Sequence, residues 1–231
     1  MKIPISPRLL ACAGLIHQGD RVADIGCDHG YLGIYLLQEG IASSIIAADI
    51  NEGPLQAAYH NAHKYGFADK MSFYLSNGVK NVPHDFNTLV CAGMGAETMI
   101  SILEAAPWLK NGQYRLVLQC QTKTYLLRRY LSKQGWSISQ EIVLRDGKFL
   151  YTLMEVCRRS EPSPLTPGQC YIPPAMLNDT TAEVAEYYQW VCKEVTKIVT
   201  ARGDSADPWM QQAMEELTTD PYYAFLKEDI L

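Results

Sequence analysis

The sequence lacks the features of a membrane-spanning, secreted or disulfide-bonded protein. Its apolar runs stay well short of the ~20 residues that a helix needs to cross a bilayer. The first ten residues, MKIPISPRLL, lack the apolar core and small-residue cleavage site of a signal peptide. Seven cysteines are scattered along the chain without a CxxC pair, which argues against a disulfide framework or a zinc site. We therefore expect a cytoplasmic protein with buried free thiols, no bound metal and no membrane partner.

Two common nucleotide-binding motifs are also missing. A dinucleotide enzyme would carry GxGxxG after its first strand, and a P-loop enzyme would carry GxxxxGK[ST]. Neither pattern occurs in the 231 residues. A dehydrogenase is therefore the least favoured reading, and a P-loop nucleotide site is disfavoured as well.

Positive charge is scarce in the last third of the chain. Residues 161–231 carry 4 Lys+Arg against 12 Asp+Glu, whereas residues 1–160 carry 16 against 13. The break falls at SEPSPLTPGQCYIPP (160–174), whose five prolines and weak periodicity are typical of a linker. We expect two domains, 1–160 and 161–231.

Within the first domain, short apolar runs alternate with segments of helical periodicity. The sequence predicts strands at 21–27, 43–50, 71–76, 86–93 and 114–120, and helices at 31–40, 52–66, 96–109 and 124–135. The segment 137–157 turns at RDG and predicts an antiparallel hairpin. This order predicts an α/β fold, a doubly wound, mostly parallel seven-stranded sheet with an antiparallel edge hairpin. In such sheets ligands bind outside the carboxyl ends of the strands.

The turn after the first strand, DIGCDHGYL (24–32), combines glycines with acids. Gly26 and Gly30 allow a sharp turn and a close approach of a ligand to the backbone. Asp24 and Asp28 would repel a phosphate but suit a ligand with an ammonium and a sulfonium. Asp49, which ends the second strand, stands where a ribose diol would be held. The combination favours S-adenosylmethionine over a dinucleotide or ATP.

Six separated motifs resemble one family of class I methyltransferases. They are SPRL (6–9), DIGCDHGYL (24–32), NEGPLQAA (51–58), NGV (77–79), AGMGAETMI (92–100) and GKFLYTLMEV (147–156). Together they resemble the bacterial tRNA (adenine-22-N1)-methyltransferase family. The resemblance implies a Rossmann-like catalytic domain, a small C-terminal helical, coiled-coil-like extension, and methyl transfer from S-adenosylmethionine to N1 of an adenine in the D-arm region of tRNA. The product would be S-adenosylhomocysteine.

The chain departs from the family in three places. It has Leu118-Gln119-Cys120-Gln121 where the family usually has LQPN, and Gly93-Met94-Gly95-Ala96 where it usually has GMGG. Its tail is short, and ARGDSADPW (201–209) interrupts the helical pattern.

These motifs give three sets of candidate site residues. The candidate catalytic residues are Asp28, His29 and Tyr31. The candidate cofactor-binding residues are Asp24, Gly26, Cys27, Gly30, Asp49, Ile50, Asn77, Gly78, Ala92, Gly93 and Met94. The candidate substrate-binding residues are Arg8, Arg128, Arg129, Lys133 and Tyr151.

The role of Asp28 stays open among three readings. It could stabilise the positive charge that develops on the adenine ring, bind the methionine ammonium, or only support the loop. Two other functions also remain: a class I methyltransferase acting on another RNA or a small molecule, and a non-catalytic S-adenosylmethionine- or RNA-binding module. A monomer is slightly favoured.

Overall fold

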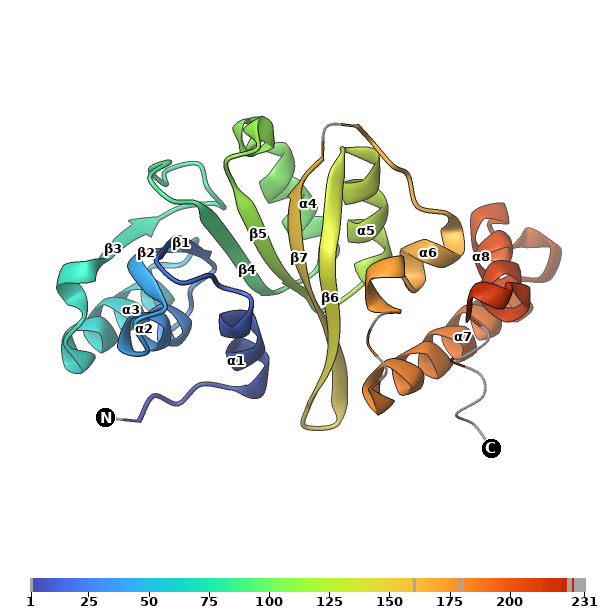
Figure 1. The fold of residues 1–231 in the computed structure, drawn as a ribbon, viewed down its shortest axis with the longest axis horizontal. Helices are drawn as coiled ribbons and strands as arrows, with labels where there is room; N and C mark the ends of the chain where they lie inside the picture. The colour runs from blue at the N-terminus through green and yellow to red at the C-terminus, as the bar shows by residue number, and fades with distance from the viewer. Residues whose placement is uncertain (1, 160, 178, 180, 224–225, 227–231) are drawn as a thin grey trace.

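A seven-stranded sheet forms the centre of the molecule, with strand order β3-β2-β1-β4-β5-β7-β6 (Figure 1). The structure is a computed structural model that describes residues 2–159, 161–177, 179, 181–223 and 226. The first five strands run parallel, and β7 pairs antiparallel with both β5 and β6. The strands are β1 (Asp20–Ile25), β2 (Ala42–Asp49), β3 (Met71–Leu75), β4 (Thr88–Met94), β5 (Arg115–Cys120), β6 (Trp136–Asp146) and β7 (Phe149–Arg158). The predicted fold class is confirmed.

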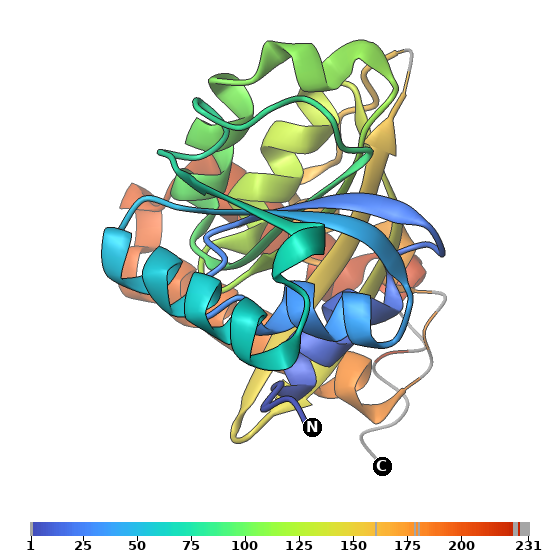
Figure 2. The same ribbon diagram turned by 90° about the vertical axis from the view of Figure 1, so that its left-hand side faces the viewer.

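Helices cover both faces of the sheet because its strands alternate their side chains between two apolar layers. In β1, Val22 packs into the layer beneath α1, α2 and α3, and its neighbour Ala23 packs into the layer beneath α4 and α5. Figure 2 shows the helices on either side of the sheet. These helices are α1 (Pro7–Gly14), α2 (Tyr31–Gln38), α3 (Glu52–Tyr65), α4 (Ala96–Glu104) and α5 (Thr124–Lys133).

The helix predicted over 96–109 ends earlier than expected. α4 stops at Glu104, and a separate 3-10 turn follows over Pro107–Asn111. Proline disfavours helical backbone in the residue before it, and Ala106 has φ −126° and ψ 59°. The apolar periodicity of the sequence continues past this point, but the backbone cannot remain helical there.

The edge hairpin is longer than the sequence indicated. Its strands pair from Trp136 opposite Arg158 to Asp146 opposite Phe149. The loop between them therefore contains only Gly147 and Lys148, and Gly147 takes the positive φ of 61° that such a tight turn requires.

The C-terminal segment folds into helices around a core of its own. They are α6 (Pro167–Tyr171), α7 (Ala182–Arg202) and α8 (Pro208–Thr219), with 3-10 turns at Pro174–Met176, Gly203–Ser205 and Pro221–Tyr223. Val184, Val191 and Leu217 belong to this core, and so does Val143 of β6. The helical extension thus packs against the edge hairpin, on the side of the sheet away from β3 (Figure 1).

The proline-rich segment 160–174 contains an ordered helix. Thr166 and Gln169 form a capping box at the start of α6, in which Pro167 occupies the first turn. Ser160, the expected domain boundary, lies outside the described residues.

A buried ion pair joins the extension to the sheet domain. Arg128 on α5 and Glu141 on β6 are fully buried, with Nη2 and Oε1 2.7 Å apart. Nη1 of Arg128 donates to the backbone oxygens of Cys170 (3.0 Å) and Tyr171 (2.7 Å) in α6. One guanidinium therefore ties α5, β6 and α6 together.

No helix within the described ranges has both the length and the apolar character needed to cross a membrane. Likewise, the described His, Cys, Asp and Glu side chains form no group of three that could hold a metal ion.

Candidate functional site

The candidate site lies at the carboxyl ends of β1, β2 and β4. β1 has β2 on one side and β4 on the other, so the strand order reverses direction beside it. In doubly wound sheets this reversal opens the crevice in which ligands bind. Three segments meet at these carboxyl ends: the DIGCDHG loop after β1, Asp49 at the end of β2, and Ala92–Met94 at the end of β4.

The two glycines of the first loop are favoured by their backbone conformation, and Gly30 also by close packing. Both have positive φ, 76° at Gly26 and 70° at Gly30. A Cβ on Gly26 would lie 2.4 Å from the terminal methyl of Met94, and one on Gly30 would lie 2.9 Å from the Cβ of Ala58. The loop is therefore held against both α3 and the end of β4. The backbone amides of Gly26 and Cys27 both donate to the carbonyl of Ala48, which fixes the loop to β2.

Asp24 is a buried carboxyl group among other acids. Its residue is 4% exposed, and no described Lys, Arg or His forms an ion pair with it. Burial, and then the negative charges of Asp49 and Asp28, raise its pKa to about 7. A cationic ligand would offset this cost, whereas an anionic one would add to it.

Asp49 connects the loop after β1 to the loop after β2. Its carboxylate accepts from the backbone N–H of Asp28 at 3.3 Å and from that of Asn51 at 2.9 Å. An ionised carboxylate has about four acceptor positions. Asp49 therefore supports the loop and keeps capacity for ligand hydroxyls.

The three candidate catalytic residues lie together at the mouth of this loop. The side chain of Asp28 is 72% exposed, and its carboxylate lies 3.6 Å from Nε2 of His29. The rings of His29 and half-buried Tyr31 are 5.8 Å apart. Asp28 also has a φ of 50°, a left-handed conformation that Asp and Asn adopt more readily than most residues.

Gly93 forms an irregularity at the end of β4 that brings Arg8 into the site. The pairing with β5 shifts register between Ala92 and Met94. The N–H of Gly93 donates to the buried Oε1 of Gln119 at 3.0 Å, and Arg8 Nη1 donates to the same oxygen at 2.7 Å. Arg8 also lies 5.9 Å from the ring centre of Tyr151.

Sequence reasoning missed the role of Gln119, which appeared only as part of an unusual LQCQ segment. A buried polar residue at the end of an apolar strand was the available signal.

The remaining candidate cofactor residues surround the loop in different ways. Ile50 is an exposed apolar side chain directly after Asp49. Gly78, with φ 61°, packs against Ile102, and Asn77 lines a pocket beside α4. The thiol of Cys27 lies in the apolar core, where burial raises its pKa, and it donates to the backbone oxygen of Asp28 at 4.0 Å.

The three basic candidates on α5 do not form one surface. Arg128 is buried against Glu141, so it cannot reach a phosphate, which corrects the expectation that it contacts tRNA. Arg129 lies 4.9 Å from the ring centre of Trp209 in the extension. Lys133 is exposed at the far end of the helix, ~14 Å along the axis from Thr124.

The sequence of this chain is similar to those of known methyltransferases. The family described as "Methyltransferase domain" matches residues 5–154. The "Putative tRNA methyltransferase MG248" of Mycoplasma genitalium is 31% identical over 160 residues, 68% of this chain and 71% of that protein. The "tRNA (adenine(22)-N(1))-methyltransferase" of Bacillus subtilis is 32% identical over 149 residues, 64% of this chain and 63% of that protein.

The likeness to a solved structure extends over the helical extension as well. A Streptococcus pneumoniae protein described as "a putative tRNA (m1A22) methyltransferase, in complex with S-adenosyl-L-methionine" superposes with a TM-score of 0.81. It is 27% identical, and the match covers 92% of this chain and 99% of that one.

Proposed function

Because this chain belongs to the tRNA (adenine-22-N1)-methyltransferase family of class I S-adenosylmethionine-dependent enzymes, we propose that it methylates N1 of adenine 22 in tRNA. The observation that carries the proposal is the acid-lined glycine loop at the reversal point of the sheet. This loop places Asp24, which is buried and has no ion-pair partner among the described residues, beside Asp49 and Asp28.

The residues present suit S-adenosylmethionine, the methyl donor of this family. Asp24 and its neighbouring acids favour the positive charges of the donor. Asp49 retains acceptor capacity for the ribose hydroxyls, and Ile50 offers an apolar surface for the adenine ring. When bound, the donor supplies an electrophilic methyl group on a sulfonium.

The reaction requires little acid–base chemistry from the protein. N1 of adenine has an in-plane lone pair, so it can attack the methyl carbon while the base is neutral. As the new N–C bond forms, the S–C bond breaks, its electron pair stays on sulfur, and the positive charge moves to the adenine ring. The chain must therefore align the base with the methyl group and stabilise the charge on the ring.

Asp28 is the group that we assign to charge stabilisation. Its carboxylate stands at the mouth of the loop and is largely exposed. A carboxylate near the N6 amino group of the target adenine would favour the cationic product. His29 and Tyr31 lie beside it and would bound the same space.

The target base must leave its paired position, because N1 belongs to the Watson–Crick edge. Tyr151 and Arg8 lie on the other side of the Gly93 loop and offer a ring and a guanidinium to an extruded nucleotide. Arg129 and Lys133 are the remaining candidates for phosphate contacts.

The proposal is tested by incubating the protein with labelled S-adenosylmethionine and unmodified bacterial tRNA and identifying the methylated nucleoside. We expect 1-methyladenosine. Label only in another RNA or in a small molecule would support the alternative substrates, and cofactor binding without any transfer would support a binding module.

A further inference from the structure

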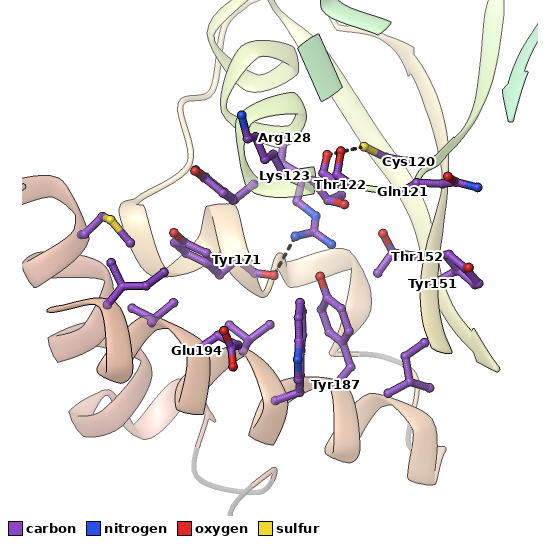
Figure 3. A pocket seen from close by; sticks show the side chains of 18 residues that line it. Cys120, Gln121, Thr122, Lys123, Arg128, Tyr151, Thr152, Tyr171, Tyr187 and Glu194 are labelled. Atoms are coloured by element: carbon purple, nitrogen blue, oxygen red, sulfur yellow. Dashed lines mark hydrogen bonds between the residues drawn. The ribbon is translucent and has the colours of Figure 1, made fainter. Parts of the chain in front are cut away.

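A second pocket lies between the sheet domain and the helical extension. Its volume is about 400 Å³, within the range of small-ligand sites. The segment Cys120–Tyr125 and the start of β7 form one wall, and α7 forms the opposite wall (Figure 3). The helical extension therefore contributes half of a concave site.

Aromatic rings supply much of the lining. Tyr151 and Tyr125 come from the sheet domain, Tyr171 comes from α6, and Tyr187 and Trp190 come from α7. Trp190 is 54% exposed although its ring lies 5.7 Å from that of Tyr187. An exposed tryptophan at the rim of an aromatic pocket is a platform on which a flat ligand can stack.

One buried polar side chain in this lining has no hydrogen-bond partner among the residues that the structure describes. Thr152 is 2% exposed, and its Oγ1 forms no hydrogen bond within the described part of the chain. Leaving a buried hydroxyl unpaired costs free energy, so a ligand that supplies the partner is favoured. Figure 3 shows Thr152 next to Tyr151, on the wall opposite Tyr187.

The pocket adjoins the Gly93–Met94 loop of the candidate site. The backbone N–H of Gln121, in the pocket wall, donates to the carbonyl of Met94 at 2.9 Å. Neighbouring strands are spaced ~4.8 Å apart, so the pocket begins about one strand beyond the Gly93–Met94 loop.

We propose that this pocket binds the base of a nucleotide directly adjacent to the target adenine in tRNA, with Trp190 stacking on it and Thr152 donating or accepting a hydrogen bond. This inference rests on the proposed function. RNA recognition commonly stacks splayed bases on aromatic side chains and reads their edges by hydrogen bonds.

Two charged residues of the lining favour a nucleotide over an uncharged small molecule. Glu194 is half-buried and can accept from an exocyclic amino group, as carboxylates do with cytosine N4. Lys123 is exposed at the rim, where it pairs with Glu97 at 2.6 Å and can also meet a phosphate.

The experiment compares intact tRNA with two tRNAs that each lack one base, on either side of the target adenine. Affinity is measured by direct binding and activity by methyl transfer, for the wild type and for Trp190→Ala. We expect one abasic tRNA to bind the wild type about 5- to 160-fold more weakly, the range that loss of base stacking gives. The affinity of Trp190→Ala for intact tRNA should be reduced by a similar factor. Its affinity for that abasic tRNA should be no lower than its affinity for intact tRNA.

A second variant avoids damage to the fold. Thr152→Val removes a hydroxyl that has no partner in the free protein, so its stability should stay equal or rise. We expect it to weaken binding of intact tRNA about 2- to 10-fold, as loss of one hydrogen bond does. Tyr59→Ala is the matched control, because Tyr59 is an exposed aromatic on α3, outside the pocket lining, and should change none of these values.

The proposal is overturned if neither abasic tRNA binds the wild type more weakly. It is also overturned if Trp190→Ala binds that abasic tRNA with an affinity reduced by the product of the two separate factors, because the base and Trp190 would then act independently. Failure of the proposed function would look different: intact tRNA would acquire no 1-methyladenosine, whatever the binding cycle showed.

Discussion

Protonation of Asp24 should control how tightly the protein binds S-adenosylmethionine near neutral pH. The pKa of this buried carboxyl group is raised to about 7, by burial first and then by Asp49 and Asp28. A positively charged ligand favours the ionised form. Binding should therefore release a proton at pH values where Asp24 is still largely protonated.

The magnitude follows from the pKa. At pH 6 about one molecule in ten carries ionised Asp24, so affinity should be about tenfold weaker than at pH 8, or ~1.4 kcal/mol. Stability of the free protein has the opposite dependence. Because the folded pKa lies above the ordinary value of 3.8, the folded state binds more protons than the unfolded state between about pH 4 and pH 7. The free energy of unfolding should fall across that window by at most ~4 kcal/mol and then level off.

The assay is isothermal titration of the cofactor at pH 6, 7 and 8, in buffers that differ in ionisation enthalpy, for the wild type and Asp24→Asn. The variant should bind the cofactor more weakly at pH 8, lose most of the pH dependence, and unfold at a higher urea concentration than the wild type at pH 8. The reasoning is refuted if wild-type affinity is constant from pH 6 to 8, or if Asp24→Asn is less stable than the wild type at pH 8.

Three further substitutions test other parts of the site and the fold. Asp49→Ala removes the acceptor for two backbone amides. Calorimetry should then show cofactor affinity weakened by at least ~1.5–3 kcal/mol, and unchanged affinity would contradict a role of Asp49 in cofactor binding. Asp28→Asn keeps a residue suited to the left-handed backbone, so single-turnover methylation should slow far more than cofactor affinity falls, and unchanged methylation would remove Asp28 from the catalytic residues. Glu141→Gln leaves the guanidinium of Arg128 buried without its counter-charge, so urea unfolding should show a loss of ~3–5 kcal/mol. A loss below ~1 kcal/mol would show that the partners other than Glu141 are enough to hold Arg128.

The order of strands and helices was predictable because the apolar periodicity changes clearly between them. The run at β1 is a short block of buried residues, and the segment after Gly30 repeats apolar residues at helical spacing. The cofactor loop was identifiable for a similar reason, since its glycines and acids are contiguous in the chain. The end of α4 was missed because the apolar pattern continued past Pro107, where the backbone could not remain helical.

The contacts that join the two parts of the molecule were not predictable from local pattern. Arg128 stands among basic residues on α5, a pattern that predicts contact with tRNA. Its partner, Glu141, lies on a strand 13 residues away, and its backbone acceptors lie in α6, more than 40 residues away. The prolines of 160–174 predicted a linker, so α6 was missed, although Thr166 and Gln169 have the spacing of a capping box. The unpaired hydroxyl of Thr152 became apparent only once its neighbours were placed in space.

The most direct test of the central claim is to map the methylated position in an unmodified tRNA transcript. The transcript is treated with the protein and S-adenosylmethionine, beside one in which adenine 22 is replaced by guanine and one in which a different D-arm adenine is replaced. We predict 1-methyladenosine at position 22 in the first and third transcripts and none in the second. Methylation that persists without adenine 22, or that forms another nucleoside, would contradict the account.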